Sequence, residues 1–210
     1  MSYNTKTIII AFDLHGVVST SDYWKILKLG LRNPGSILRL GLYSFNPFFL
    51  KKVYQLWRSH KVAAAYLQMV ETDYPFLKPT IDFLIQVGNA QQANQPLVAF
   101  IKQLQARGYQ VHLFSNIGDL ILDDLVAKQP DLINLFDAIC YTHAHTDYVG
   151  KPYDAAFHAY HAQCNPMGKQ VIFVDNTKRN ITAAQRHGMI GILYRSANDA
   201  IEQISTLLKP

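Results

Sequence analysis

The chain has 210 residues, 49% of them hydrophobic and 17% charged, which is ordinary for one globular unit with or without an insertion. Its two cysteines, Cys140 and Cys164, have neither the number nor the spacing of a disulfide framework or a zinc site, and no signal-type segment opens the chain, so we expect a cytoplasmic protein. The net charge of +5 lies entirely in residues 20–92, where the longest charge-free stretch, residues 40–50, is far shorter than the roughly 20 residues of a transmembrane helix.

The first predicted element is a strand at residues 8–12, in the stretch IIIAF. A continuous run of β-branched and apolar residues is typical of a strand that is buried on both faces of a parallel sheet. The run ends abruptly in Asp13, which is followed by His15 and Gly16. Because ligands bind at the carboxyl ends of parallel strands, Asp13 is the first candidate for chemistry.

Residues 20–92 contain no convincing β run but several apolar helical patterns, interrupted by prolines, and we interpret them as a helical insertion. The insertion is rich in aromatic and basic residues, namely Tyr23, Trp24, Tyr43, Phe45, Phe48, Phe49, Tyr54, Trp57, Lys51, Lys52 and Arg58. Such a composition is compatible with binding to nucleic acid or to an anionic membrane. Aromatic residues at helical spacing more often form a domain's own core, so we favour a basic cover over a site for small phosphorylated molecules and expect no nucleic acid partner.

From residue 93 onward, predicted helices and strands alternate at the spacing of βαβ units. Helical patterns occupy residues 96–107, 118–129, 153–163, 179–189 and 198–208, and apolar strands occupy residues 109–116, 136–142, 170–175 and 191–194. This alternation predicts an α/β fold with a doubly wound, Rossmann-like parallel sheet. We therefore expect a core formed by residues 1–19 and 93–210 and a second, all-helical unit formed by residues 20–92.

Polar residues end three of these strands: Asp13 follows the first, Ser115 and Asn116 end the second, and Asp175 ends the strand at residues 170–175. Lys151 lies in a loop after another strand. In an open parallel sheet, reactive groups gather at the carboxyl ends of the strands. We expect these side chains to form one site.

The segments FDLHGVV, LFSN, GKPYDAAF and FVDNTKRNITAAQRHGMIGILY, in that order, resemble the four motifs of the haloacid dehalogenase-like (HAD) hydrolase superfamily. The resemblance covers residues 7–19 and 95–197. The helical insertion directly after the first motif is similar to the helical cap of that family. The resemblance implies that the protein is a hydrolase of the phosphatase branch, namely a phosphomonoesterase that acts on a small organic phosphate.

The resemblance also implies a role for each candidate residue. Asp13 would attack phosphorus and form an aspartyl-phosphate, which divides one difficult hydrolysis into two easier steps. Ser115 and the main-chain amide of Asn116 would hold phosphoryl oxygens, while Lys151 would offset the negative charge of the reacting groups. Positioning and charge neutralisation are what phosphoryl transfer chiefly needs.

The implied cofactor is Mg²⁺, which prefers oxygen ligands from one or two carboxylates together with water and phosphate. By resemblance, Asp13, Asp175 and the main-chain carbonyl of His15 would bind it.

Two residues depart from the family pattern. His15 stands where phosphatases usually have an acid/base aspartate, a role that an imidazole can fill near neutral pH, although its charged form could instead weaken metal binding. Asn176 replaces a frequent second aspartate, which predicts a modest metal affinity.

Two other functions remain open at this stage. His15 and Asn176 would also suit a family member with weak or no turnover that binds phosphate or a partner. A 2-haloacid dehalogenase is the other alternative, because dehalogenases of the family also lack an acidic residue at the position of His15. The presence of Asp175 favours the metal-dependent phosphatase, and Asn180 is expected to support the site or start a helix without binding the metal.

Three further histidines have less claim to function. His143 and His145 are two residues apart and could share one face of a strand, but two ligands without a third make a weak metal site. We interpret them as part of a polar loop near the active-site rim. His112 lies inside an apolar strand and is expected to be a core histidine with a hydrogen-bond partner.

Overall fold

The fold is that of a computed structural model, which describes residues 7–51, 62–88, 90–141 and 149–209. Its centre is a five-stranded sheet in the order β5-β4-β1-β6-β7, in which every neighbouring pair is parallel. The strands are β1 (Ile8–Phe12), β4 (Gln110–Ser115), β5 (Ala138–Tyr141), β6 (Gln170–Asp175) and β7 (Ile190–Leu193). Because the first strand is central and the chain proceeds to both sides of it, the predicted doubly wound α/β fold is confirmed.

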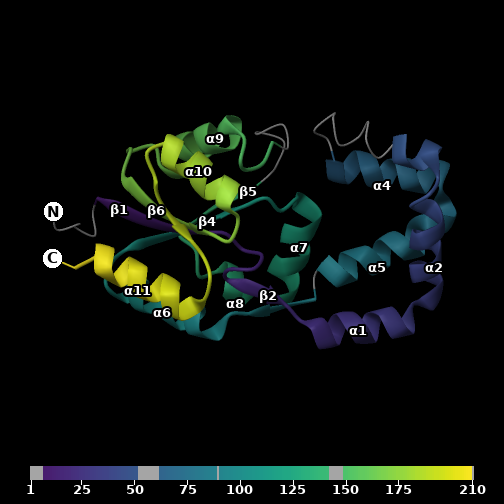
Figure 1. Cartoon of the computed structure of the whole chain (residues 1–210), viewed down its shortest axis with the longest axis horizontal. Helices are drawn as coiled ribbons and strands as arrows, with labels where there is room; N and C mark the ends of the chain where they lie inside the picture. The colour runs from purple at the N-terminus through teal and green to yellow at the C-terminus, as the bar shows by residue number, and fades with distance from the viewer. Residues whose placement is uncertain (1–6, 52–61, 89, 142–148, 210) are drawn as a thin grey trace.

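Helices cover both faces of this sheet (Figure 1). On one face lie α9 (Asp154–Cys164) and α10 (Lys178–Arg186), and on the other α6 (Gln95–Ala106) and α11 (Ala197–Leu207). The helix α7 (Asp119–Lys128) and the short helix α8 (Pro130–Ile133) connect β4 to β5. Alternating strands and helices predicted this layering, although the sequence did not indicate α8 as a separate element.

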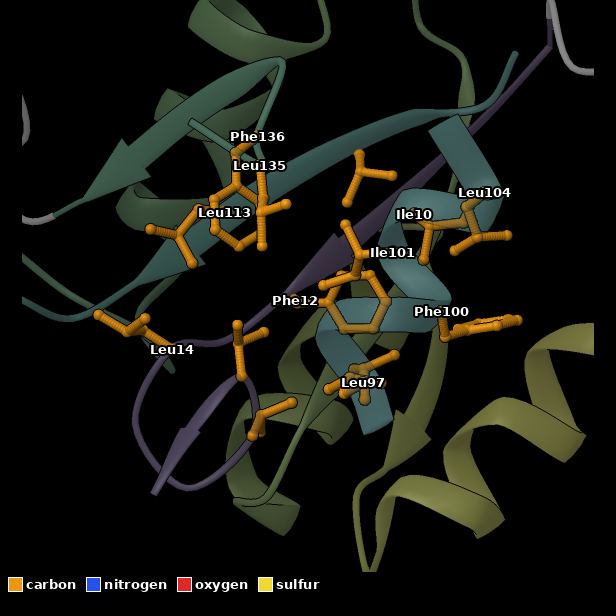
Figure 2. Close-up of a cluster of buried hydrophobic side chains, with 14 of the residues drawn as sticks. Ile10, Phe12, Leu14, Leu97, Phe100, Ile101, Leu104, Leu113, Leu135 and Phe136 are labelled. Carbon is orange, nitrogen blue, oxygen red and sulfur yellow. The ribbon is translucent and has the colours of Figure 1, made fainter. Parts of the chain in front are cut away.

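Strand β1 supplies both layers of the core. Ile8, Ile10 and Phe12 pack in the cluster that contains the buried face of α6, whereas Ile9 and Ala11 pack in the cluster beneath α9 and α10. Figure 2 shows the first cluster, with Ile10 and Phe12 directed toward the side chains of α6. Successive side chains of a strand point to opposite faces, so an uninterrupted apolar run is what two covered faces require.

The segment between β1 and α6 is mostly helical, as predicted, and lies beside the sheet rather than on its faces (Figure 1). Its helices include α1 (Tyr23–Arg32), α2 (Pro34–Tyr43), α4 (Val62–Asp73), the 3-10 turn η1 (Pro75–Leu77) and α5 (Lys78–Gly88). A small cluster of Val70, Leu77 and Ile81 forms a core for this insertion. No helix of the described residues is long and apolar enough to cross a membrane.

The absence of β structure from residues 20–92 was predicted wrongly. β2 (Ser19–Ser21) and β3 (Gln91–Ala93) form an antiparallel two-stranded ribbon where the insertion joins the core. Each strand has three residues, and five of the six are Ser, Thr or Gln. Such strands pair through their backbones and carry no apolar alternation, so the sequence pattern does not reveal them.

The expectation that the insertion's aromatic residues form its own core is wrong for four of them. Tyr23, Trp24, Phe45 and Phe48 are 74–86% exposed. Tyr43 and Phe49 do pack together at the edge of the small cluster, with ring centroids 5.7 Å apart. The segment with Tyr54, Trp57, Lys52 and Arg58 lies outside the described residues. Helical spacing indicated an apolar face on each helix, but it could not indicate whether another element covers that face.

The expectation for His112 is confirmed. It lies on β4 with 2% of its surface exposed, and its Nδ1 is 3.0 Å from the hydroxyl oxygen of Tyr160. Burial disfavours the charged imidazolium and lowers the pKa of His112 to about 4. His112 is therefore neutral at physiological pH and belongs to the core.

Burial of His112 predicts a loss of stability in acid. In the unfolded chain the imidazole takes up its proton near pH 6.5, whereas in the folded protein it does so only near pH 4. The unfolded state thus binds more protons in this window, and the free energy of unfolding should fall by up to about 3 kcal/mol between pH 6.5 and 4 on account of His112. Above pH 6.5 this contribution to the pH dependence is absent.

Urea unfolding of wild type and His112→Gln across pH 7.5 to 4 measures the effect. The difference in unfolding free energy between the two proteins should shrink as the pH falls through this window. Gln103→Ala, which changes an exposed residue of α6 and no titratable group, serves as the control and should leave the pH dependence unchanged. Parallel pH curves for wild type and His112→Gln would contradict the assignment.

Candidate active site

The ammonium group of Lys151 joins the carboxyl ends of three adjacent strands. Its Nζ donates to Asp13 Oδ1 at 3.0 Å, to Asp175 Oδ2 at 2.8 Å and to the main-chain oxygen of Phe114 at 2.6 Å. The side chain of Lys151 is 1% exposed. An ammonium group has three N–H donors, and each of them has an acceptor here. The structure therefore brings together three of the residues predicted to form one site.

Asp13 occupies the position from which a nucleophile could reach a ligand. It directly follows β1, and its amide donates to the carbonyl of Val174 at 2.9 Å, which ties it to the neighbouring strand β6. Its side chain is 12% exposed, in contrast to the fully buried Asp175. In the described part of the chain, no hydrogen bond reaches Asp13 Oδ2. One oxygen is thus held by Lys151 while the other is free to react or to bind a cation.

Asp175 is held in a single orientation by three donors in addition to its place at the end of β6. Its Oδ1 accepts from the amide of Thr177 at 2.7 Å, and its Oδ2 accepts from both Lys151 Nζ and the side-chain amide of Asn180 at 2.9 Å. Asn180 is buried in the first turn of α10. It contacts the candidate site through Asp175, which is the supporting position that the sequence predicts.

Asn116 holds the loop that carries Lys151. Its side-chain amide donates to the carbonyl of Lys151 and its side-chain oxygen accepts from the amide of Lys151, both at 2.7 Å. A Cβ atom at Gly150 would lie 2.6 Å from the side-chain oxygen of Asn116, so this close approach requires glycine. Sequence reasoning assigned Asn116 only a main-chain role, because it could not show where the side chain points.

Two aromatic rings also face the ammonium group of Lys151. Its Nζ lies 5.0 Å from the ring centroid of Phe114 and 4.8 Å from that of Phe173. The electron-rich faces of aromatic rings attract cations, so these rings stabilise the buried charge. In the sequence they read as ordinary apolar residues of two strands, and only the pairing of the strands with β1 reveals their second role.

Ser115 ends β4 with 2% of its surface exposed and lines a small cavity together with residues of the loop that precedes Lys151. The cavity is also lined by Phe114, Asn116, Cys140, Tyr141, Val149, Gly150 and Ala156. The thiol of Cys140 is a possible competing nucleophile, but a hydrogen bond with Cys164 and burial both raise its pKa. Cys140 is therefore held as the protonated thiol, which is a poor nucleophile.

The turn after Asp13 brings the main chain of His15 against Asn176. Gly16 has a φ of +79°, and a Cβ atom there would overlap the side-chain nitrogen of Asn176. The Asn176 amide donates to the carbonyl of His15 at 3.3 Å. The imidazole of His15 is only partly exposed, and its Nδ1 is buried without a hydrogen-bond partner among the described residues. Its catalytic use stays a prediction.

The donor groups at this edge fit a hard cation. Asp13, Asp175 and the carbonyl of His15 offer oxygen atoms, and no group of three or more His, Cys, Asp or Glu side chains able to hold a metal occurs among the residues that the structure describes. Magnesium binds through one or two carboxylates and keeps several waters, so a dedicated cage of side chains is not required. His143 and His145, the weaker metal candidates, lie outside the described residues.

Removal of the Lys151 charge should destabilise the fold strongly. Lys151→Met leaves Asp13 and the buried Asp175 facing each other without their shared cation. Breaking a buried ion pair by removing one partner typically costs about 3–5 kcal/mol. We expect a loss of that size in the free energy of unfolding at pH 7, measured by urea denaturation.

The double variant Lys151→Met/Asp175→Asn tests the cause of that loss. Since one of the two facing carboxylates is then neutral, part of the lost stability should return, and a double-mutant cycle measures this coupling. Additive effects of the two substitutions would contradict a direct electrostatic interaction. Lys102→Met removes an exposed lysine of α6 and should leave stability nearly unchanged.

Three solved structures illustrate the similarity of the fold to known proteins. A predicted HAD-like family hydrolase from Porphyromonas gingivalis is 19% identical, with a TM-score of 0.67 over 97% of this chain and 98% of the other. A HAD family enzyme from Bacteroides thetaiotaomicron, solved with magnesium and inorganic phosphate, is 15% identical, with a TM-score of 0.62 over 90% and 94%. L-2-haloacid dehalogenase from Xanthobacter autotrophicus is 19% identical, with a TM-score of 0.56 over 96% and 84%.

At these identities the similarity shows the fold, and a search of curated proteins found no match. The sequence itself matches the family model described as haloacid dehalogenase-like hydrolase over residues 9–188. That range contains Asp13, Ser115, Lys151 and Asp175, and it covers most of the chain. The protein therefore belongs to the haloacid dehalogenase-like hydrolases.

Proposed function

We propose that the protein is a magnesium-dependent phosphomonoesterase that acts on a small organic phosphate through an aspartyl-phosphate on Asp13. The observation that carries this proposal is the arrangement of Asp13 and Asp175 around one buried ammonium group, with the hydroxyl of Ser115 at the end of the adjacent strand. A partly exposed carboxylate that is held on one oxygen and free on the other suits nucleophilic attack.

In the first step, a carboxylate oxygen of Asp13 forms a bond to phosphorus while the bond from phosphorus to the ester oxygen breaks. The leaving alkoxide takes up a proton, and we propose the imidazole of His15 as its donor because His15 lies two residues after the nucleophile. In the second step, neutral His15 accepts a proton from water, which attacks phosphorus and releases phosphate from Asp13. Both proton transfers then use the same group.

Lys151 and Ser115 would act on the transferring group. The ammonium group of Lys151 offsets negative charge on Asp13 and on the phosphoryl oxygens, and the hydroxyl of Ser115 and main-chain amide of Asn116 donate to those oxygens. Because Lys151 is held by three acceptors and Asn116 fixes its backbone, little reorganisation accompanies the reaction. Preorganised donors of this kind contribute most to such catalysis.

The charges of the site support a role for a divalent cation. One ammonium group against two carboxylates leaves Lys151, Asp13 and Asp175 with a net negative charge, to which a phosphate would add more. Magnesium, when bound by the two carboxylates and the carbonyl of His15, supplies the positive charge that offsets this excess. The Bacteroides thetaiotaomicron structure with magnesium and inorganic phosphate supports this assignment by its similar fold.

We further propose that residues 20–92 act as a cap that restricts access to a core formed by residues 1–19 and 93–210. The insertion begins directly after the turn that follows Asp13, and its ends are paired in the ribbon of β2 and β3. An element in this position can exclude water and select the substrate.

The nucleophile is tested by Asp13→Asn. With an aryl phosphate as substrate and Mg²⁺ present, the variant should lose at least about 10³-fold in kcat, because a neutral amide cannot form the acyl phosphate. Wild type treated with a chelator should also lose its activity. Asp154→Asn, at an exposed aspartate, is the control and should retain wild-type turnover.

Equal hydrolysis by wild type and Asp13→Asn would reject the proposed mechanism. The dehalogenase alternative predicts a different result, namely halide release from a 2-haloacid without added metal. A binding module predicts no turnover of either substrate in any condition.

Asn176→Asp tests the proposed metal site. The change places a carboxylate beside the carbonyl of His15 and removes the amide that donates to it. Added ligand charge strengthens the binding of hard cations, so the Mg²⁺ concentration for half-maximal activity should fall by about tenfold. An unchanged Mg²⁺ dependence would contradict the assigned position of the cation. Asn134→Asp adds a charge at the end of α8 and should have no such effect.

A further inference from the structure

The first helix of the insertion, α1, contributes no buried residue to the fold. Its large apolar side chains are instead exposed: Tyr23 by 80%, Trp24 by 74%, Leu27 by 52% and Leu31 by 75%. Trp24, Leu27 and Leu31 are spaced by three and four residues, so they lie on one face of the helix. A helix that presents its apolar face to solvent lacks the packing that normally stabilises it.

The exposed apolar surface continues on α2 and the segment after it. Its members are Ile37 (49%), Leu38 (65%), Leu42 (64%), Phe45 (86%), Phe48 (77%) and Leu50 (48%). The two helices pack together, since a Cβ atom at Gly30 would lie 3.5 Å from Cδ1 of Ile37. α1 leads away from β2, and α2 lies at the end of the insertion remote from the sheet (Figure 1). A concentration of exposed apolar residues of this kind marks an interaction surface.

Basic residues accompany these apolar residues. Between residues 22 and 51 the chain has five basic side chains, Lys25, Lys28, Arg32, Arg39 and Lys51, and a single acidic one, Asp22. Asp22 is occupied, because it caps α1 by accepting from the amide of Lys25 at 2.9 Å. Lys25, Lys28 and Arg32 are exposed and make no ion pair within the described ranges. The surface therefore combines apolar side chains with an uncompensated positive charge.

The positive charge of this apolar surface indicates which kind of partner it binds. In a symmetric dimer the same patch would face itself, so each basic residue would meet a surface of the same sign. A single-stranded nucleic acid would use the cations and the aromatic rings, but most of the exposed apolar side chains here are Leu and Ile, which offer no stacking surface. An anionic bilayer satisfies both features, because apolar side chains enter its interface while Lys and Arg bind its headgroups.

We propose that the surface formed by α1, α2 and residues 44–51 docks on anionic lipid membranes. Binding is peripheral, with Trp24, Leu27 and Leu31 in the headgroup region and the basic side chains against acidic lipids. This role is independent of the hydrolytic site, which uses other residues.

Co-sedimentation of the full chain with lipid vesicles tests the proposal. Vesicles of phosphatidylcholine with phosphatidylserine should bind the protein at least about tenfold more strongly than vesicles of phosphatidylcholine alone, and added salt should weaken the binding. Trp24→Ser/Leu31→Ser and Lys25→Glu/Lys28→Glu should each lower the affinity by at least about tenfold, the first through lost apolar insertion and the second through charge. Circular dichroism confirms that each variant is folded.

Matched control variants lie on the core. Met167→Ser removes an apolar side chain that is 83% exposed, and Lys102→Glu reverses an exposed charge on α6. Both should bind vesicles as wild type does. The proposal is overturned if wild type fails to bind phosphatidylserine vesicles at low salt, or if the variants of α1 bind as well as the controls. Concentration-dependent dimerisation through this face, without vesicle binding, would likewise overturn it in favour of a second copy of the chain.

Discussion

The burial of the Lys151 ammonium group is the interaction on which the order of the central strands depends. Placing the ammonium group of Lys151 in an interior with 1% exposure is costly unless its charge and its three N–H groups are all matched. Matching them requires that β4, β1 and β6 be neighbours, since Phe114, Asp13 and Asp175 come from these three strands. The order of the strands and the arrangement of the site therefore depend on each other. A different strand order would leave the charge of Lys151 or of its carboxylates buried without a partner.

The core and the charged site residues could be predicted from the sequence because apolar runs mark the strands and the charged residues stand at the ends of those runs. An apolar run that ends in Asp13 or Asp175 shows the strand and the polar residue at once, and alternation with helices then predicts the sheet. The support of Lys151 by Asn116 and by two aromatic rings was not predicted, because it depends on side-chain direction and on contacts between strands distant in sequence. The ribbon of β2 and β3 was missed for a related reason, since its pairing is made by backbone groups.

The insertion shows the opposite limit. Helical spacing located its helices between residues 23 and 88, but the same spacing suggested an internal core for aromatic residues that are in fact exposed. Periodicity identifies an apolar face and contains no information on what covers it. No element of the described chain covers Trp24 and Phe45, whereas the rings of Tyr43 and Phe49 pack against each other. Burial is thus a property of tertiary arrangement that the one-dimensional pattern does not fix.

The two ends of the insertion are paired with each other before the chain enters the core. Ser19 pairs with Ala93, the amide of Asp22 donates to the carbonyl of Ala90 at 2.8 Å, and the amide of Asn94 donates to the carbonyl of Val18 at 2.9 Å. The two ends of the insertion therefore lie next to each other, so the roughly 70 residues between them connect to the core at one place, as a short loop would. A unit grafted in this way can be exchanged, enlarged or lost in evolution while Asp13 keeps its place, so the surface that the protein presents to its surroundings can diversify independently of its chemistry.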